Sequence, residues 1–193
     1  MQSEQRLMQK QAAIYGLLFG VIVLIIGLVA LYWIASTSAM PVVIASPVLL
    51  SFIIPLGLAV VFTLQLRKYV GGYWSMRQAT SGIFLMFFTA YFVYSLGNFV
   101  YARAVDKTIN ERVQQNIIKV TTDFASKQNI PTEELDEKID QIKESIEAGK
   151  HPTPGHVAQG IIFSIIILFV GALIFAAIFK KEPPVFENKS QLS

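Results

Sequence analysis

The sequence predicts an all-α integral membrane protein with four transmembrane helices and an extracytoplasmic helical hairpin between the third and the fourth. Hydrophobic residues make up 53% of the 193 residues and charged residues only 15%, whereas about a quarter of a typical soluble domain is charged. The charges are also segregated, since no Asp, Glu, Lys, Arg or His occurs in residues 11–66, 78–102 or 157–179. Uncharged apolar stretches of about 18 or more residues are typical of membrane-spanning helices.

Cysteine content, histidine spacing and net charge exclude several functional classes. The chain has no cysteine, which excludes disulfides, a thiolate nucleophile and any cysteine-based metal site. His151 and His156 could share a metal, but their surroundings supply no further Zn²⁺ ligands, so a proline-stiffened linker is favoured and no cofactor is expected. The formal net charge is +3. In a membrane protein basic residues chiefly set orientation, so we expect membrane lipids rather than nucleic acid as their partners.

A polar cytoplasmic segment at 1–11 precedes the first predicted span at 12–34. A cleaved signal peptide has a similar basic start, but its apolar core is only about 7 to 15 residues long. Residues 14–34 would extend over roughly 31 Å at about 1.5 Å per residue, enough to cross the hydrocarbon layer, so a retained helix is favoured. The spacing of Gly16 and Gly20 lets two helices approach closely, either within one chain or between two copies.

The segment 35–47 is predicted to be a short extracytoplasmic turn, because Pro41 and Pro47 interrupt a continuous helix. The second span follows at 48–66. Pro55 lies inside this span, where we expect a kink. Broken helices also line substrate sites in transporters, but a plain proline kink is favoured because no charged residue lies nearby.

Residues 67–78 form a turn that is basic, aromatic and glycine-containing. Gly71 and Gly72 provide the backbone freedom for a tight reversal of the chain. We expect the positive charges to lie at the lipid headgroups on the cytoplasmic side, with the aromatic side chains at the same depth. The basic residues are Arg67, Lys68 and Arg77, and the aromatic residues are Tyr69, Tyr73 and Trp74.

The third predicted span, 79–102, is rich in Phe and Tyr. These rings either stack on a lipid or isoprenoid chain or pack against the other helices, and packing is favoured. Asn98 lies close to the far interface and is expected to hydrogen-bond a neighbouring helix, for about 1 kcal/mol. Residues 104–107 contain no proline, so the span can continue as helix into the next segment.

Residues 103–157 are hydrophilic and are predicted to form the helical hairpin. Thr108 and Glu111 match a capping box at the start of its first helix. The second helix starts near Thr132 and carries apolar residues at helical spacing, which form the candidate partner face: Leu135, Ile139, Ile142 and Ile146. The apolar faces of the two helices can seal each other, lie on the bilayer or bind a partner.

The last span is predicted at 158–179 and is followed by a cytoplasmic tail at 180–193. Gly171 lies on a face of small residues suited to close helix packing. Lys180 and Lys181 end the span and are expected at the lipid headgroups.

The charge distribution predicts the orientation of the chain. The N-terminus, the turn 67–78 and the C-terminal tail together hold eight basic and three acidic residues, whereas residues 103–157 hold eight basic and ten acidic ones. Segments rich in Lys and Arg stay in the cytoplasm. Both termini and the basic turn are therefore predicted to be cytoplasmic, and the hairpin to lie outside the cytoplasm.

Several segments in order carry a family resemblance: Gly16–Gly20, the turn Arg67–Gln78, Gly97–Tyr101, Thr153–Gly155 and Gly171–Lys181. Together with the acidic hairpin they resemble, over nearly the whole chain, the bacterial membrane family known as domain of unknown function 4199. The resemblance implies a multi-pass protein with four spans in the inner (cytoplasmic) membrane of Gram-negative bacteria, and it brings no activity or catalytic residue. It also implies a partner class, polyprenyl-phosphate glycosyltransferases, near which members are encoded.

The predicted spans contain no ionisable group other than tyrosine. Membrane enzymes need acids, bases or metal ligands, and coupled transporters use intramembrane charges, so neither class is favoured. We expect a non-enzymatic scaffold or accessory subunit for a membrane or envelope partner, acting as a homo-oligomer or with another membrane protein. The alternative is a small oligomeric lipid- or isoprenoid-handling protein, or a pore lined by polar residues of the spans: Thr63, Gln65, Thr89, Ser95 and Asn98.

Overall fold

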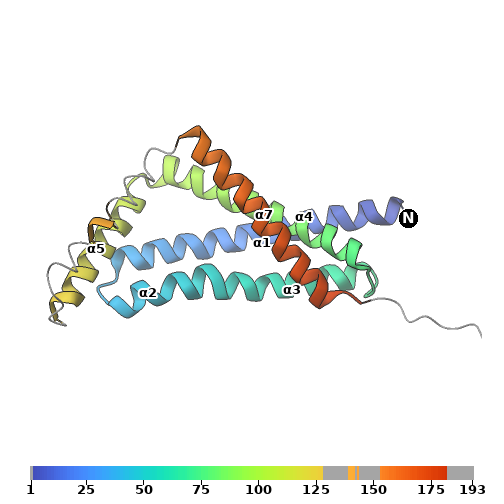
Figure 1. Ribbon diagram of the computed structural model, residues 1–193, viewed down its shortest axis with the longest axis horizontal. Coiled ribbons are helices and arrows are strands. Elements are labelled where there is room, and N and C mark those ends of the chain that lie inside the picture. Colours follow the sequence, from blue (N-terminus) through green and yellow to red (C-terminus); the bar gives the residue numbers. More distant parts are fainter. Residues whose placement is uncertain (1, 128–138, 142, 144–152, 182–193) are drawn as a thin grey trace, which may run out of the picture.

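The structure, a computed structural model, describes residues 2–127, 139–141, 143 and 153–181 (Figure 1). Apart from one isolated β-bridge, all regular elements of these residues are helical. Four helical stretches are long and apolar enough to cross a membrane: Gln5–Ser36, Met40–Tyr69, Met76–Val105 and Pro154–Phe179. Helices suit this composition because in a bilayer every backbone N–H and C=O must be paired within the protein. The prediction of an all-α protein with four long apolar helices is therefore confirmed.

The second span starts earlier than predicted. The first helix, α1 (Gln2–Ser36), is followed directly by α2 (Met40–Val48), the π-helical turn η1 (Leu49–Ile53) and α3 (Ile54–Tyr69). Only three residues separate α1 from α2. The prediction of a turn over 35–47 was therefore wrong.

Proline position explains the error. Pro41 lies in the first turn of α2, where the N–H that proline lacks would have no helical partner in any case. Pro47 lies inside α2, and Pro55 lies in the first turn of α3, with η1 between them. The irregularity expected at Pro55 is thus a π-helical turn before it, which is one of the known causes of a bend in a helix.

The third span ends at a defined break. It consists of α4 (Met76–Val100) and the π-helical turn η2 (Tyr101–Val105). Asp106 then has extended backbone angles, φ −139° and ψ 94°, so the helix does not continue into the hydrophilic segment. The next helix, α5 (Ile109–Lys127), is the first helix of the predicted hairpin.

The fourth span, α7 (Pro154–Phe179), begins four residues before the predicted start at 158. Thr153 caps it, because its hydroxyl accepts a hydrogen bond from the backbone N–H of His156 at 3.3 Å. His156 therefore belongs to the first turn of a helix rather than to a linker. His151 and most of the second hairpin helix, including Leu135, Ile142 and Ile146, lie outside the described residues.

Glycines bring α1 and α4 into close contact. A Cβ atom on Gly16 would lie 2.5 Å from the carbonyl oxygen of Met86, and one on Gly20 would lie 2.7 Å from that of Ala90. Such distances are too short for any side chain, so both positions require glycine. The pair predicted from its spacing thus lies against another helix of the same chain.

The core of the bundle consists of aromatic side chains and small residues that pack between the four spans. Phe87 of α4 packs edge-on against Phe175 of α7, with ring centroids 5.3 Å apart, and Phe84 packs in the same way on Phe169 at 5.7 Å. Ala172 and Ala176 of α7 are fully buried against this cluster. Several rings of the aromatic third span therefore serve in packing between helices.

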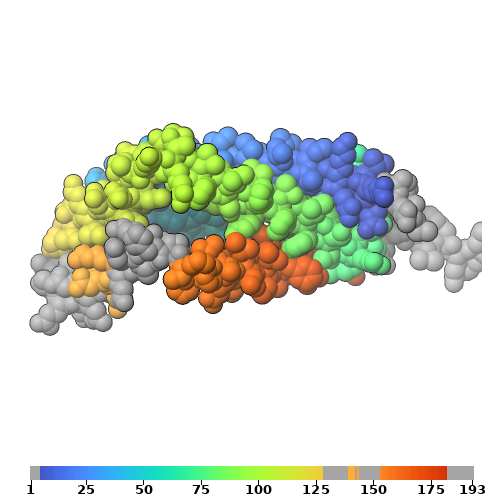
Figure 2. Space-filling model, turned by 90° about the horizontal axis from the view of Figure 1, so that it is seen from above, coloured from blue at the N-terminus to red at the C-terminus, as the bar shows by residue number. Residues whose placement is uncertain are grey.

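The two ends of α7 differ in their packing. In Figure 1 α7 crosses α4 obliquely and approaches the end of α3 near its own C-terminus. The apolar side chains of its first half are mostly exposed, for example Ile162, Phe163 and Ile166. In Figure 2 a hollow lies between α4 and α7, with the cyan-to-teal surface of the second span at its base.

The helix α5 docks on the end of α1 opposite to the basic turn. Ile109 and Val113 form a buried cluster with Ile34 of α1. The amide nitrogen of Asn116 donates to the carbonyl oxygens of Ile34, at 2.7 Å, and Thr37, at 2.6 Å. These carbonyls close the end of α1, where backbone oxygens have no helical partner, so Asn116 both caps α1 and holds α5.

Candidate functional site

The turn between α3 and α4 reverses the chain through its two glycines. Gly71 and Gly72 have φ angles of +92° and +84°, in the left-handed region that favours glycine. The backbone N–H of Gly72 donates to the carbonyl oxygen of Arg67 at 2.9 Å, and that of Gly71 donates to Lys68 at 3.1 Å. Bonds of this kind close the end of α3, so both glycines serve the tight reversal expected from the sequence.

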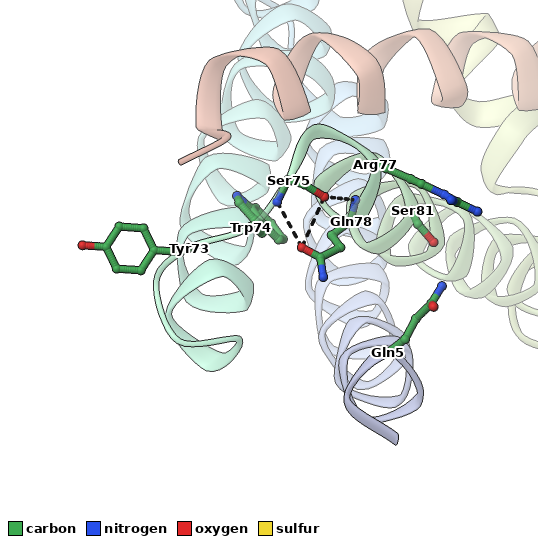
Figure 3. Close-up of a pocket in the computed structure, with 7 residues that line it drawn as sticks. All are labelled: Gln5, Tyr73, Trp74, Ser75, Arg77, Gln78 and Ser81. Carbon is green, nitrogen blue, oxygen red and sulfur yellow. Dashed lines mark hydrogen bonds between the residues drawn. The ribbon is translucent and has the colours of Figure 1, made fainter. Parts of the chain in front are cut away.

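A capping box that the sequence analysis missed begins α4. The Ser75 hydroxyl accepts a hydrogen bond from the Gln78 N–H at 3.4 Å, and the Gln78 side-chain oxygen accepts one from the Ser75 N–H at 3.0 Å (Figure 3). Each side chain thereby pairs a backbone donor that the start of a helix leaves free. The Ser-x-x-Gln pattern was available in the sequence as a signal for this start.

Trp74 is buried, contrary to the expectation that its ring faces the lipid headgroups. It is 2% exposed, its indole Nε1 donates to the carbonyl oxygen of Phe179 at 2.9 Å, and its backbone N–H donates to that of Lys181 at 2.9 Å. A guanidinium nitrogen of Arg67 lies 3.5 Å from the same Phe179 oxygen. Because the end of a helix leaves carbonyl oxygens unpaired, these donors join the turn to the end of α7.

The five basic residues predicted to contact lipid headgroups all lie at this end of the bundle. Arg67 is half-buried, whereas the other four are exposed, and the Lys181 ammonium lies 5.3 Å from the centre of the Tyr73 ring. The exposed members are Lys68, Arg77, Lys180 and Lys181. The exposed charges can meet anionic groups at a membrane surface.

A pocket of about 710 Å³ lies beside the turn, lined by Gln5 of α1, Tyr73, Arg77, Ser81 and the Ser75–Gln78 cap. In Figure 3 the side chains of Gln5, Ser81 and Arg77 lie on the side of the cap away from Tyr73. The lining offers polar groups and one cation, which suits a polar or anionic headgroup rather than a buried apolar ligand.

Asp106 is the centre of a second polar cluster, at the opposite end of the bundle. The Tyr32 hydroxyl donates to Asp106 Oδ2 at 3.0 Å, and the Thr108 backbone N–H and hydroxyl each donate to Oδ1 at 3.0 Å. Arg112 of α5 forms an ion pair with Oδ2. Since the Tyr32 proton is directed to Asp106, Tyr101 is the donor in the 2.6 Å bond between the two tyrosine hydroxyls.

These contacts favour the charged form of Asp106. Desolvation of the carboxyl acts in the opposite direction, but the hydrogen bonds from Thr108 and Tyr32 and the charge of Arg112 outweigh it, so the pKa of Asp106 is lowered. The predicted capping box takes a different form from the expected one, because the Thr108 hydroxyl bonds Asp106. The cluster fixes the angle at which α5 leaves η2.

An apolar cavity of about 460 Å³ lies between the four spans. Its walls come from α1, from η1 and α3, from α4 and from α7, and include Phe19, Phe52, Ala59, Tyr94 and Phe175. A wall of this kind can hold a hydrocarbon chain, and Tyr91 and Tyr94 are the ionisable residues in its lining.

The polar residues proposed to line a pore do not meet in this cavity. The cavity lining contains none of Thr63, Gln65, Thr89, Ser95 and Asn98. The Thr63 hydroxyl is buried without a hydrogen-bond partner among the described residues, and Gln65 is exposed on α3. These five residues therefore do not line this cavity of the described bundle.

The remaining predicted site residues have varied environments. Gly171 lines the apolar cavity, and a Cβ atom there would lie 4.0 Å from the Phe87 ring, an ordinary contact. Among the described residues, no hydrogen bond of the Asn98 side chain is found. Ile139 is buried, and the rest of the candidate partner face lies outside the described residues. No cluster of three or more potential metal ligands occurs within the described part of the chain.

Comparison with known proteins identifies a family but no characterised relative. A family model described as "Protein of unknown function (DUF4199)" matches residues 14–181, from the fourth turn of α1 to the residue paired with Trp74. No curated protein and no solved structure matches the chain.

Proposed function

This chain belongs to the DUF4199 family of proteins of unknown function, and we propose that it is a non-enzymatic scaffold or accessory subunit of the bacterial inner membrane. It is a multi-pass membrane protein with four spans. Its partner is a membrane or envelope protein or a second copy of the chain. A polyprenyl-phosphate glycosyltransferase is the partner class that the family resemblance suggests.

Charge supports a cytoplasmic position for the basic turn and both termini. Lys68, Arg77, Lys180 and Lys181 are exposed at the end where α3, α4 and α7 meet the turn. Basic residues near the ends of spans stay in the cytoplasm and attract anionic lipids, at about 1 kcal/mol for each Lys or Arg near the surface. With this orientation α5 projects from the extracytoplasmic face.

The observation that carries the scaffold proposal is the attachment of α5 to the spans. Asn116 bonds two carbonyl oxygens at the end of α1, and Asp106 joins η2 to Tyr32 of α1 and Arg112 of α5. The apolar face of α5 is used in this attachment, while its outer face, for example Glu111 and Lys119, is exposed. A hydrophilic helix held at a fixed angle is preorganised for a partner, which reduces the entropy lost on binding.

The experiment is purification of the tagged protein in mild detergent from the bacterium in which it occurs, with identification of the proteins that co-elute. A stoichiometric protein partner, or a stable homo-oligomer in which α5 cross-links to α5, supports the proposal. A monomer that carries only lipid contradicts it.

Two variants of α5 make this experiment specific. Asn116→Ala removes the bonds to α1 and should reduce the amount of partner recovered. Asn110→Ala, an exposed change on the same helix, is the control and should leave recovery unchanged. Replacement of Ile139 by Asp should likewise reduce the recovery of a partner that binds the second hairpin helix.

The second candidate function, binding or handling of lipid, is favoured by the apolar cavity. The cavity lies between the spans, and all four spans place aromatic side chains on its walls, among them Phe19, Phe52, Phe87 and Phe175. Its volume of about 460 Å³ falls within the range of about 300–1,000 Å³ typical of ligand pockets. Bound lipid in the purified protein, in place of a protein partner, would favour this function.

A further inference from the structure

We propose that the apolar cavity holds the end of one acyl chain of an anionic phospholipid whose phosphate group lies between Arg67 and Lys180. This inference rests on the second candidate function and names its ligand. It is independent of whether the protein also serves as a scaffold.

The cavity is an apolar recess of about 460 Å³ that the four spans leave between them. Protein interiors are close-packed and contain few spaces larger than a water molecule, so a recess of this size at the lipid-facing surface has room for an occupant from the bilayer. Its wall is mostly hydrocarbon, with Phe19 and Val23 from α1, Phe87 from α4 and Leu168 from α7. Water gains few hydrogen bonds there, so the natural occupant in a bilayer is an apolar chain.

The irregular turn η1 helps to form the cavity. Ser51 and Phe52 of η1 and Pro55 of α3 all belong to its lining. A π-helical turn changes the direction of the side chains beyond it, and such turns are frequent at functional sites. Here the turn supplies part of the cavity wall.

The cavity opens sideways to the lipid. Phe52 is 67% exposed and Ile167 is 54% exposed, although both line the cavity, so they form its rim. An acyl chain can therefore enter from the bilayer without unfolding any helix.

The distance to the basic end matches the length of an acyl chain. On α7 the lining runs from Ile167 to Phe175, roughly 8 to 20 Å along the helix from Lys180 at about 1.5 Å per residue. An acyl chain extends over about half of the roughly 30 Å hydrocarbon layer. A phospholipid with its phosphate beside Lys180 would thus place the end of one chain in the cavity.

The positive charges of Arg67 and Lys180 favour an anionic lipid headgroup. The Arg67 guanidinium lies at the C-terminus of α7, 3.5 Å from the Phe179 carbonyl oxygen, and its remaining N–H donors can bind a phosphate. Lys180 is exposed one residue further along the chain. Two cations near the surface favour phosphatidylglycerol over the zwitterionic phosphatidylethanolamine.

The test fills the cavity and measures bound lipid. Gly171→Leu places a side chain into the cavity, since a Cβ atom at Gly171 meets only the Phe87 ring, at 4.0 Å. Gly160→Leu is the matched control on the same helix, where a Cβ atom has no neighbour within 4 Å. Each protein is equilibrated with phosphatidylglycerol vesicles, extracted in mild detergent and analysed by native mass spectrometry, with circular dichroism to verify folding.

We expect the natural protein and Gly160→Leu to retain one phosphatidylglycerol, and Gly171→Leu to lose most of it while remaining helical. Equal retention by the two leucine variants would overturn the proposal. The same protein purified from its bacterium should carry a species with the mass of a phospholipid, and a polyisoprenoid mass in its place would also overturn it. If Gly171→Leu loses the lipid but still co-elutes with a protein partner, the scaffold proposal holds independently of the lipid site. If it keeps the lipid, only the lipid proposal fails.

A second measurement separates the headgroup from the chain. Retention from phosphatidylethanolamine vesicles should be several-fold lower than from phosphatidylglycerol, and Lys180→Gln should remove this preference. A phospholipid with a diazirine at the end of one acyl chain should cross-link to the cavity walls at the end away from Lys180, around Phe52 or Ile167. Cross-links spread evenly along the exposed face of α7 would contradict a defined chain site.

Discussion

The indole Nε1 of Trp74 donates a hydrogen bond to the backbone carbonyl oxygen of Phe179 at 2.9 Å, across a sequence separation of 105 residues. The bond joins the turn after the second span to the end of the fourth span. Together with the backbone pairing of Trp74 and Lys181, it gives α7 a fixed attachment at the basic end, whereas the first half of α7 has mostly exposed side chains.

Removal of this bond should destabilise the bundle. Trp74→Phe keeps most of the buried ring but leaves the Phe179 oxygen with the distant Arg67 donor, and we expect a loss of about 1–3 kcal/mol in the free energy of unfolding. Trp74→Ala also creates a cavity and should cost about 3–5 kcal/mol. Equilibrium unfolding in detergent micelles measures both losses.

The chain contains only one other tryptophan, Trp33, which is 52% exposed and supplies the control. Trp33→Phe should change stability little. It also isolates the fluorescence of Trp74, which should be blue-shifted because the indole is buried. A red-shifted emission from this variant would show that Trp74 faces the headgroups instead.

The contact of α1 with α4 should not tolerate a side chain at Gly20. A Cβ atom there would lie 2.7 Å from the Ala90 carbonyl oxygen and 2.8 Å from the Val93 Cβ, so Gly20→Val forces the two helices apart. Overpacking of this kind costs about 1–3 kcal/mol. The change should appear as a lower midpoint of thermal unfolding in detergent.

Gly57→Val is the control for this prediction, because a Cβ atom at Gly57 has no neighbour within 4 Å. It should leave the midpoint nearly unchanged. An oligomer that dissociates in Gly20→Val while the monomer keeps its stability would instead assign the glycine pair to contacts between copies.

The Asp106 cluster predicts how the docking of α5 depends on pH. The pKa of Asp106 is lower in the folded protein than in the unfolded chain. Its stabilising contribution is therefore complete above the unfolded value, about 3.9, and is lost as the pH falls through the folded value. The difference in unfolding free energy between the natural protein and Asp106→Asn should be constant above about pH 5 and should shrink below about pH 4.

Equilibrium unfolding of both proteins over this range checks the sign. A difference that grows on acidification would mean that the protonated carboxyl is the stabilising form. Arg112→Gln is a useful companion, because it removes the ion pair with Asp106 and should reduce the same difference at neutral pH.

Features that depend on composition along the chain were predictable, and features that depend on a distant partner were not. Charge-free windows indicated the four spans because the bilayer imposes the same requirement on every residue of a span. The burial of Trp74 depends on Phe179, which lies in another helix. The sequence around Trp74 resembles an interfacial aromatic cluster, and only the position of α7 turns the ring inward.

Two further differences have local causes. The turn predicted over 35–47 failed because proline was treated as a helix breaker at every position, although Pro41 lies in the first turn of α2, where proline is tolerated. Asn116 was not identified because its partners, the carbonyls of Ile34 and Thr37, carry no side-chain signal. The apolar cavity was likewise invisible, since its wall comes from four separate spans.

The orientation of the chain can be measured with introduced thiols, because the natural chain has no cysteine. Lys119→Cys lies on the exposed face of α5, and Lys68→Cys lies at the exposed end of α3. With a membrane-impermeant maleimide on intact spheroplasts, we expect labelling of Lys119→Cys at once and of Lys68→Cys only after permeabilisation. The reason is that the basic turn should be cytoplasmic.

Lys181→Cys tests orientation and structure together. The backbone oxygen of Lys181 is bonded to Trp74, so both thiols at the basic end, Lys68→Cys and Lys181→Cys, must label alike. The reverse pattern for all three variants would invert the orientation and move the proposed phospholipid to the outer leaflet. Different labelling of Lys68→Cys and Lys181→Cys would instead contradict the attachment of α7 to the turn, since one end of a bundle cannot face both sides of the membrane.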